Sequence, residues 1–421
     1  MPARAPLCRG NAGAGHASIS TMFGIPSKVE SDEGTIDELL SRGVAEALPS
    51  KESLKTLLMS GKRLRIKLGI DPTGANLHIG NSVPLLKLRS FQELGHTVVL
   101  IVGDFTATIG DTSDKESERP MLSRAAIAEN MKTYKEQVGK ILDLSKTEFR
   151  RNSAWLGTLT YQEIGEHADI FSVSDFIARD AISRRLKGGK RVSLREVLYP
   201  LMQGYDSVAV KADVELGGAD QRFNLLAGRA LQEHFGQVPQ HILTFALVTD
   251  GAGKKVSKTG AATVYLTDTP DTMFGKTMSV PDELVEQYFI SMTRKPMDEV
   301  RALLTGHPRD AKLALAYELV EMYHSKEKAE NAKESFIQTF SNKQTPDTMP
   351  LRVVQRNTTY LDALSNSGLV ASKNEARRLF AEGAVSSMLT NTVIGDPEAI
   401  LTQPDKLKIG KKRFLEIKID T

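Results

Sequence analysis

The residues best suited to chemistry lie where a strand pattern gives way to a helix pattern. Residues 64–70 alternate apolar with charged or small side chains, which predicts a strand, and the turn at residues 71–74 (DPTG) ends it. From His78 onward the apolar residues recur at helical spacing, so His78 lies on the first turn of a helix. The free N–H groups and positive dipole end of such a helix favour a bound phosphate. Many α/β proteins carry this pattern and bind nothing there, so His78 alone leaves both interpretations open.

A lysine-rich run far downstream, residues 254–259 (KKVSKT), lies in a Gly-rich loop. A histidine at a helix start (HIGN) followed at a distance by such a loop resembles the paired signature motifs of the class I aminoacyl-tRNA synthetases. The pair is much more specific than either motif alone.

Length and composition bound the protein class. A chain of 421 residues is too long for a single core and predicts roughly two to four domains. Its 40% hydrophobic and 25% charged residues are typical of a soluble globular protein, and a net charge of +3 permits a nucleic-acid partner without requiring one. Cys8 is the only cysteine, which excludes a disulfide or a cysteine-ligated zinc within one chain and favours a reducing compartment. No metal site and no transmembrane run is predicted.

Residues 1–21 are poor in acid and rich in Ala, Gly and Ser, a composition similar to that of transit peptides. We prefer an upstream start codon preceding Met22, because the apolar periodicity is too weak for an amphipathic presequence. The segment is expected to be disordered, and the protein to be cytoplasmic.

The strand after the first helix is a continuous apolar run at Thr97–Gly103. Together these elements form a βαβ unit, the start of a doubly wound parallel sheet in an α/β fold. No GxGxxG follows the first strand, so a dinucleotide fingerprint is absent. Asp111 lies beyond the second strand, where it either meets a ligand or merely forms a turn. Residues 123–143 are predicted to be a helix.

Polar residues share a face with core residues in the predicted helix Leu194–Val208. Tyr199, Gln203 and Asp206 fall at i, i+4 and i+7, either as a core tyrosine with two solvated neighbours or as a polar pocket wall. A strand at Val214–Leu216 with the turn after it repeats the strand-turn-helix pattern. Further elements are predicted in order: a last strand at Ile242–Val248, short helices over Pro270–Phe340, and a linker at Asn342–Met349.

The rest of the chain reads as a small basic α+β unit. Residues 351–421 hold 11 Lys or Arg against 8 Asp or Glu, an excess equal to that of the whole chain. Helices are predicted over Tyr360–Asn366 and from Ser372, followed by a strand over Lys411–Ile419.

Taken together, the motifs resemble those of bacterial tyrosyl-tRNA synthetases over residues 35–421. The strings DPTGANLHIG, VGDFTATIGD, YPLMQGYDSVAVKADVELGGADQRFN and KKVSKT occur in that family's order, and the tail is similar to an S4 RNA-binding domain. The resemblance implies five segments: a disordered extension at 1–21, a Rossmann-like catalytic domain at 22–265, a helical anticodon-side domain at 266–340, a linker at 341–356 and the S4 domain at 357–421.

The implied activity joins L-tyrosine to ATP as tyrosyl-adenylate, releases pyrophosphate and transfers tyrosine to the 3′ end of tRNA(Tyr). ATP with accompanying Mg²⁺, a homodimer and no membrane partner are implied as well. The tyrosine site would contain Asp111, Tyr199, Gln203, Asp206 and Gln221. The ATP site would contain Gly69, Asp71, His78, Gly80, Asn81, Asp220, Lys255, Ser257 and Lys258. The catalytic residues would be Thr73, His78, Lys115, Arg119, Lys255 and Lys258. RNA would be bound by Lys373, Arg377, Arg378, Lys411, Lys412 and Arg413.

Some positions depart from the best-known branch of this family. Lys67 replaces a tyrosine that touches the substrate hydroxyl, and Asn81 replaces the last histidine of HIGH. Both fit a second bacterial branch, leave Asp206 as the main reader of the hydroxyl, and leave the role of Lys67 open. Val256 and Thr259 are milder changes, because the lysines carry the charge.

Three other functions compete with this one. An S4-type RNA-binding protein with an inactive catalytic half would not need its phosphate-site residues. A tryptophanyl-tRNA synthetase would share the fold but generally lacks the S4 tail. A nucleotidyltransferase would not explain the helical segment after the lysine loop.

Overall fold

The computed structural model describes residues 29–111, 117, 121–246, 263–341, 349–390, 392–410 and 413–420. The chain divides into two compact units. The first consists of Met1–Thr267 and Pro281–Leu304, and the second of Asp268–Val280 and Thr305–Thr421. The segment 1–21 lies outside the described residues. Within the part of the chain that is described, no helix is long and apolar enough to cross a membrane.

The first unit contains a six-stranded sheet in the order β1-β6-β5-β2-β3-β4. Its strands are β1 (Val44–Leu48), β2 (Arg65–Ile70), β3 (Thr97–Val102), β4 (Thr147–Arg151), β5 (Val214–Gly218) and β6 (His241–Phe245). Strands β2 to β6 pair in parallel, and only β1 runs antiparallel, along β6. This confirms the predicted α/β fold with a parallel sheet.

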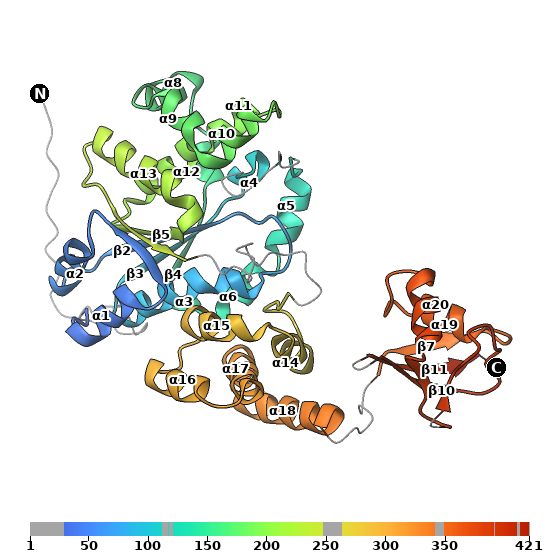
Figure 1. Ribbon diagram of the computed structural model, residues 1–421. Coiled ribbons are helices and arrows are strands. Elements are labelled where there is room, and N and C mark those ends of the chain that lie inside the picture. Colours follow the sequence, from blue (N-terminus) through green and yellow to red (C-terminus); the bar gives the residue numbers. More distant parts are fainter. Residues whose placement is uncertain are drawn as a thin grey trace, which may run out of the picture. The chain divides into compact units, whose positions relative to one another are not determined.

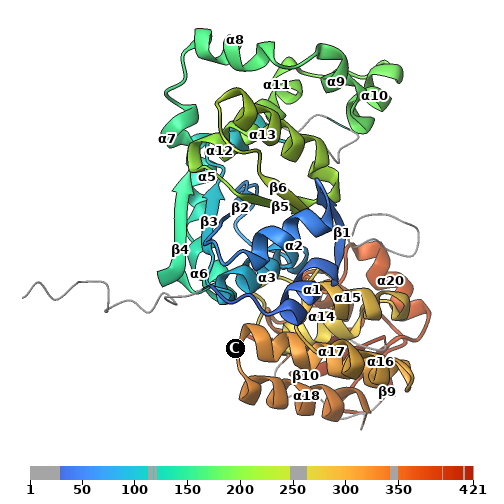
Figure 2. The same ribbon diagram turned by 90° about the vertical axis from the view of Figure 1, so that its left-hand side faces the viewer.

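Helices cover both faces of this sheet, with α12 and α13 on one side and α1, α3 and α6 on the other (Figures 1 and 2). Two-sided cover explains why β3 is buried from its second residue to its last. The helices of this unit are α1 (Glu33–Ser41), α2 (Lys51–Met59), α3 (Ile79–Glu93), α4 (Thr106–Ile109), α5 (Arg124–Met131), α6 (Tyr134–Gly139), α7 (Ser153–Leu156), α8 (Tyr161–Asp169), α9 (Val173–Ala178), α10 (Asp180–Lys187), α11 (Leu194–Val197), α12 (Tyr199–Val210), α13 (Arg222–His234), α15 (Val285–Met292) and α16 (Met297–Leu304).

Two predicted helices are each split in the structure. Residues 123–143 form α5 and α6, and residues 194–208 form α11 and the longer α12. The second break falls at Leu198, with Pro200 in the first turn of α12. Proline lacks the N–H that would continue the preceding helix but suits a helix start, so apolar periodicity alone overlooks this boundary.

The second unit contains the helices α14 (Pro270–Met278), α17 (Pro308–Tyr323) and α18 (Lys326–Ser341). Its tail holds a five-stranded sheet in the order β7-β11-β10-β8-β9, with α19 (Tyr360–Ser365) and α20 (Lys373–Ala381). The strands are β7 (Leu351–Val354), β8 (Val385–Ser387), β9 (Thr392–Val393), β10 (Asp405–Ile409) and β11 (Arg413–Ile419). Leu361, Phe380 and Ile417 share its buried core. The predicted α+β character of the tail is confirmed.

The packing of α12 on α13 depends on a glycine. A Cβ at Gly204 would lie 2.8 Å from Leu231 Cδ1 and 3.0 Å from backbone atoms of Ala227 and Gly228. Backbone atoms cannot move aside as the end of a flexible side chain can. We therefore expect Gly204→Ala to lower the free energy of unfolding of this unit by about 1–3 kcal/mol.

Denaturant unfolding followed by the fluorescence of Trp155, the only tryptophan, measures this change. Gly165→Ala in α8 is the matched control, since its Cβ would meet nothing within 4 Å. The control should be neutral or stabilised by up to about 1 kcal/mol. Equal stability of the two variants would contradict the proposed packing constraint.

Candidate active site

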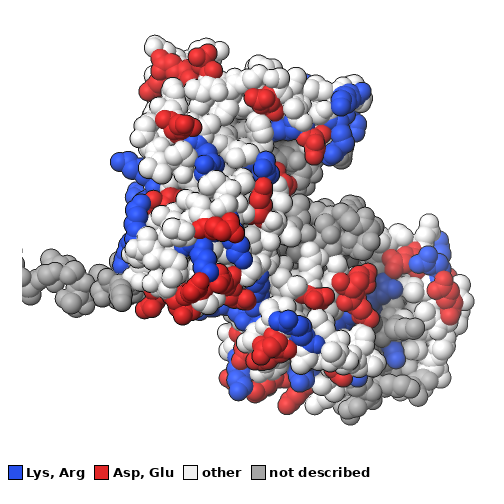
Figure 3. Space-filling model, turned by 60° about the vertical axis from the view of Figure 1, so that its left-hand side comes forward, with Lys and Arg blue, Asp and Glu red and all other residues white. Residues whose placement is uncertain are grey.

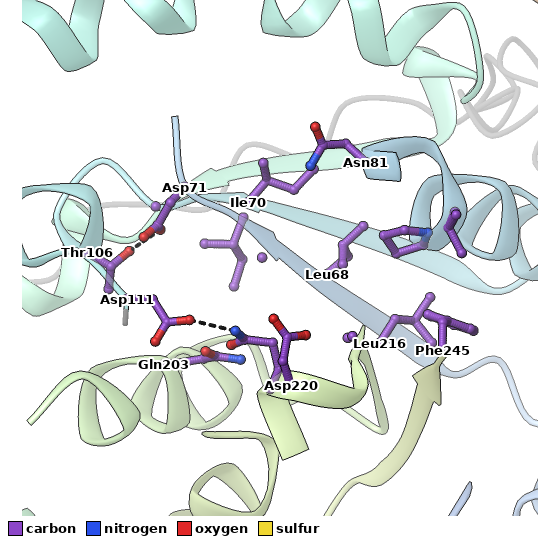
Figure 4. Close-up of a pocket in the computed structure, with 18 of the residues that line it drawn as sticks. Leu68, Ile70, Asp71, Asn81, Thr106, Asp111, Gln203, Leu216, Asp220 and Phe245 are labelled. Atoms are coloured by element: carbon purple, nitrogen blue, oxygen red, sulfur yellow. Dashed lines mark hydrogen bonds between the residues drawn. The ribbon is translucent and has the colours of Figure 1, made fainter. Parts of the chain in front are cut away.

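A cavity of about 310 Å³ lies at the carboxyl ends of β2 and β5, against the starts of α3 and α12 (Figure 4). Twelve residues that the sequence assigned to a site line it together: Gly69, Asp71, Thr73, His78, Gly80, Asn81, Asp111, Tyr199, Gln203, Asp206, Asp220 and Gln221. Five residues assigned to catalysis or to ATP lie outside the described part of the chain: Lys115, Arg119, Lys255, Ser257 and Lys258. The topology explains the gathering, because the ends of parallel strands meet at one edge of the sheet.

The start of α3 forms one end of the cavity. His78 is its N-cap, and His78 Nδ1 accepts a hydrogen bond from the Gly80 N–H at 3.1 Å. Asn81 Oδ1 accepts from the His78 N–H at 3.1 Å, which completes a capping box. Since Nδ1 accepts, the neutral imidazole carries its proton on Nε2. The predicted helix start is therefore confirmed, and Asn81 has a capping role in place of a second histidine.

The helix start is also pinned by the chain that follows the lysine loop. The Ile79 N–H donates to the Val264 carbonyl at 2.9 Å, and the Leu266 N–H donates to the Leu77 carbonyl at 2.9 Å. On the other side of the loop, Phe245 and Ala246 line the cavity. Residues 247–262 are not described, but the two segments that flank them both lie at this site.

At the opposite end of the cavity, Tyr199 belongs to a polar network. Its hydroxyl donates to Asp71 Oδ2 at 2.9 Å, while Asp71 Oδ1 accepts from Thr106 Oγ1 at 2.7 Å. Burial, reinforced by the charges of Asp71 and Asp111, raises the pKa of the Tyr199 phenol well above its usual value. Tyr199 therefore keeps its proton at neutral pH and donates it in a hydrogen bond to Asp71. Asp111 Oδ2 accepts from Gln221 Nε2 at 2.6 Å (Figure 4).

Asp206 is a buried carboxylate in the same wall, with only 4% of its surface exposed. Trp155 Nε1 donates to it at 2.7 Å and Asn152 Nδ2 at 3.2 Å. Burial raises the pKa of Asp206 to about 7, although these two donors and the positive charge of Lys67 act in the opposite direction. Of the two interpretations open for the face of Tyr199, Gln203 and Asp206, the structure therefore favours the pocket wall.

Asn152 and Trp155 are site residues that the sequence analysis missed. Asn152 is fully buried, lines the cavity and also donates to Thr106 Oγ1 at 2.9 Å. Both residues follow β4, an edge strand of sequence TEFRR whose polar composition hides its strand character. The order of the strands along the chain could have identified these two residues, because polar residues after a fourth parallel strand would reach the same edge of the sheet.

The residues assigned to RNA lie in the tail. Lys373, Arg377 and Arg378 are exposed on α20, while Lys411 and Lys412 are not described. Arg413 donates to the Leu369 carbonyl at 2.7 Å and to Glu375 Oε1 at 2.9 Å, so it also holds β11 against the start of α20. Among described residues, no group of three or more His, Cys, Asp or Glu side chains is placed to hold a metal ion.

The two ends of the cavity differ in charge preference. Asp71, Asp111 and Asp220 surround one space (Figure 4), which suits the donors of a ligand such as an ammonium or hydroxyl group. The start of α3 carries the positive end of the helix dipole and the His78 ring, and it suits an anion. The arrangement thus fits two ligands at once, one with donor groups and one with phosphates.

Comparisons with known proteins agree with this geometry. A family described as tRNA synthetases class I (W and Y) matches residues 59–341. A relative from Carboxydothermus hydrogenoformans, named Tyrosine--tRNA ligase, is 43% identical over 400 residues, 90% of this chain and 97% of that protein. One of the same name from Thermotoga maritima is 42% identical over 390 residues, 90% of this chain and 96% of that protein. The chain therefore belongs to the class I tRNA synthetase family of the tryptophan and tyrosine enzymes. Within that family it falls among the tyrosine–tRNA ligases, as its motifs predicted.

Solved structures show the same fold at lower identity. A C-terminally truncated mitochondrial tyrosyl-tRNA synthetase from Aspergillus nidulans superposes with a TM-score of 0.61 at 22% identity, covering 73% of this chain and 94% of that one. The corresponding protein from Coccidioides posadasii gives 0.60 at 24% identity, covering 71% and 91%. The predicted fold class is confirmed by these neighbours.

The hydrogen bond between Trp155 and Asp206 makes the ionisation of the site observable. Because Asp206 has a pKa of about 7, we expect Trp155 fluorescence to change with a midpoint near pH 7 in the full-length protein. Asp206→Asn should abolish this transition while leaving the far-ultraviolet circular dichroism unchanged. A transition that persists in the variant would assign the titration to another group.

Proposed function

We infer that the chain is a tyrosine–tRNA ligase, which activates L-tyrosine with ATP and transfers it to tRNA(Tyr). The observation that carries this inference is the match in both sequence and site. Relatives of that name align over about nine-tenths of the chain, and the cavity combines a buried hydroxyl acceptor with a phosphate-binding helix start. Nothing in the comparisons supports an inactive RNA-binding protein.

The amino-acid half of the cavity would hold tyrosine by its two polar ends. The phenolic hydroxyl donates to Asp206, the most buried carboxylate of the wall. Asp111, Tyr199 and Gln203 bind the ammonium group, with Gln221 held beside Asp111. A pocket built around buried acceptors rejects phenylalanine, because it would leave them unpaired.

The nucleotide half lies between β2, the start of α3 and the turn after β5. Gly69 suits a backbone that passes close to the adenylate, since a Cβ there would meet no protein atom within 4 Å and would occupy ligand space. Asp220 binds the ribose, and Thr73 with His78 Nε2 holds the γ-phosphate. Gly80 and Asn81 in the first turn of α3 and Asp71 after β2 complete this half.

Activation needs positioning more than proton transfer. The carboxylate of tyrosine is already ionised and attacks the α-phosphate, and the bond to pyrophosphate breaks. Negative charge grows on the leaving group, where His78 donates and Lys255, Ser257 and Lys258 would approach from the loop whose flanks lie at the cavity. Lys115 and Arg119 would join them from a second loop. Mg²⁺ would enter with ATP, held mainly by phosphate oxygens.

The remaining segments would serve tRNA and dimerisation. We assign catalysis to 22–265, anticodon-side contacts to 266–340 and RNA binding to the S4 domain at 357–421, after a linker at 341–356. Exposed basic residues on α20 support the last assignment. The protein would act in the cytoplasm.

A homodimer is supported by apolar side chains exposed on α8 to α11. Tyr161, Val173 and Leu194 are 94%, 74% and 71% exposed. Figure 3 shows uncharged surface in this region between acidic residues over α8 and basic residues over α10. Such a surface is typical of a protein–protein contact.

A pyrophosphate-exchange assay across the twenty amino acids tests the proposed function. We expect exchange with tyrosine alone. Asp206→Ala should lower the preference for tyrosine over phenylalanine in kcat/KM by about 10- to 100-fold, because the hydroxyl loses a buried acceptor. Asp175→Ala, an exposed carboxylate on α9, is the control and should retain the wild-type preference. Exchange with a different amino acid would overturn the assignment.

Deleting residues 351–421 tests the division of labour between the units. The residues assigned to tyrosine and ATP all precede this segment, whereas the basic excess lies within it. The truncated protein should retain pyrophosphate exchange and lose most tRNA charging, and charging by the intact protein should weaken with added salt. A truncated protein with native Trp155 fluorescence but no exchange would contradict the division.

A further inference from the structure

Lys67 is a fully buried lysine in the central strand β2, beside the cavity but not part of its lining. Its ammonium group has three N–H donors and three protein acceptors. It donates to Ser207 Oγ at 2.8 Å, to Glu215 Oε1 at 2.9 Å and to the Gln203 carbonyl at 3.0 Å. Since every donor has a partner, Lys67 has none left for a substrate hydroxyl.

Glu215 is the counter-ion and is equally buried. Glu215 lies directly opposite Lys67 in the pairing of β5 with β2. Besides Lys67, its oxygens accept from Gln203 Nε2 at 3.2 Å, from Ser207 Oγ at 2.9 Å and from Gln240 Nε2. Hydrogen bonds on this many sides hold the buried pair in one geometry.

This network holds the cavity wall from behind. Gln203 is bound at both its backbone carbonyl and its side-chain amide, and its Oε1 also accepts from Asn224 Nδ2 at 3.1 Å. Asp206 lies between Gln203 and Ser207 on the same turn of α12. Lys67 contacts Gln203 and Ser207, which flank Asp206 in α12, and the charges of Lys67 and Glu215 both act on the Asp206 carboxylate.

We propose that the Lys67–Glu215 pair determines substrate specificity without touching substrate, by fixing Gln203 and setting the electrostatic field at Asp206. This proposal rests on the proposed tyrosine ligase function. Both residues are positioning residues. Asp206, rather than Lys67, reads the hydroxyl.

The charges around Asp206 predict in which direction each substitution shifts the ionisation of Asp206. Lys67 on β2 favours the ionised carboxylate, and Glu215 on β5 disfavours it. The neutral donors Asn152 and Trp155 also favour the ionised form, and the Tyr199 phenol stays protonated. Removing the charge of Glu215 should therefore stabilise ionised Asp206, and removing that of Lys67 should do the reverse.

The experiment compares Glu215→Gln with the double variant Glu215→Gln, Lys67→Met in the full-length protein. Trp155 fluorescence is titrated against pH, and tyrosine and phenylalanine kcat/KM are measured in pyrophosphate exchange over the same range. Glu215→Gln should move both midpoints to lower pH, so that it keeps its preference for tyrosine in more acidic buffer. Adding Lys67→Met should move both midpoints back up. The KM for ATP should not change in either variant.

Lys62→Met is the matched control, because Lys62 is 60% exposed and pairs with Asp213 at 2.8 Å away from this network. It should keep the wild-type midpoint. If the double variant does not fold, the lower midpoint of the near-isosteric Glu215→Gln alone decides the question. Unchanged midpoints in folded variants would overturn the proposal and leave the pair a purely structural role. If exchange proves specific for another amino acid, the function fails, while the fluorescence titration still tests the charge coupling.

Discussion

The cross-strand pair of Lys67 and Glu215 is the interaction on which the site depends. It joins β2 to β5, two of the strands whose carboxyl ends border the cavity, and it binds α12 to both of them through Ser207 and the Gln203 carbonyl. Two isolated charges at this depth would strongly destabilise the fold, but each is neutralised by the other and satisfied by hydrogen bonds. The sheet and the pocket wall are thus held in one arrangement before a ligand arrives.

Preorganisation continues from this pair along the wall. Asn152 connects Asp206 to Thr106, and Thr106 connects to Asp71, which in turn accepts from the Tyr199 hydroxyl. The two ends proposed for tyrosine therefore belong to one chain of hydrogen bonds. Such a chain orients acceptors that must already be in place when the substrate binds, because reorganising them would consume binding energy. Catalysis by positioning depends on acceptors that are oriented before the substrate binds.

The phosphate end is built on a different principle. It uses the backbone, through the N-terminus of α3, and a histidine whose tautomer is set by its own cap. The described segment that follows the lysine loop pairs with residues on either side of His78, so it is fixed at the site. The rigid end would select the amino acid, whereas the end next to the loop would respond to charge that develops during the reaction.

The sequence by itself determined the local elements and the family. The period-two run at 64–70, the turn after it and the helical spacing from His78 predict a strand, a turn and a helix start, and the ordered motifs predict the class I synthetase family. These features are readable because each is encoded over a few consecutive residues. Only the tertiary structure decided that Trp155 and Asn152 donate to Asp206 and that Lys67 pairs with Glu215. The two donors of Asp206 lie more than 50 residues away from it in the chain, after a polar edge strand that has no clear sequence pattern. Lys67 donates to a carboxylate on the neighbouring strand because both side chains are buried between the same elements.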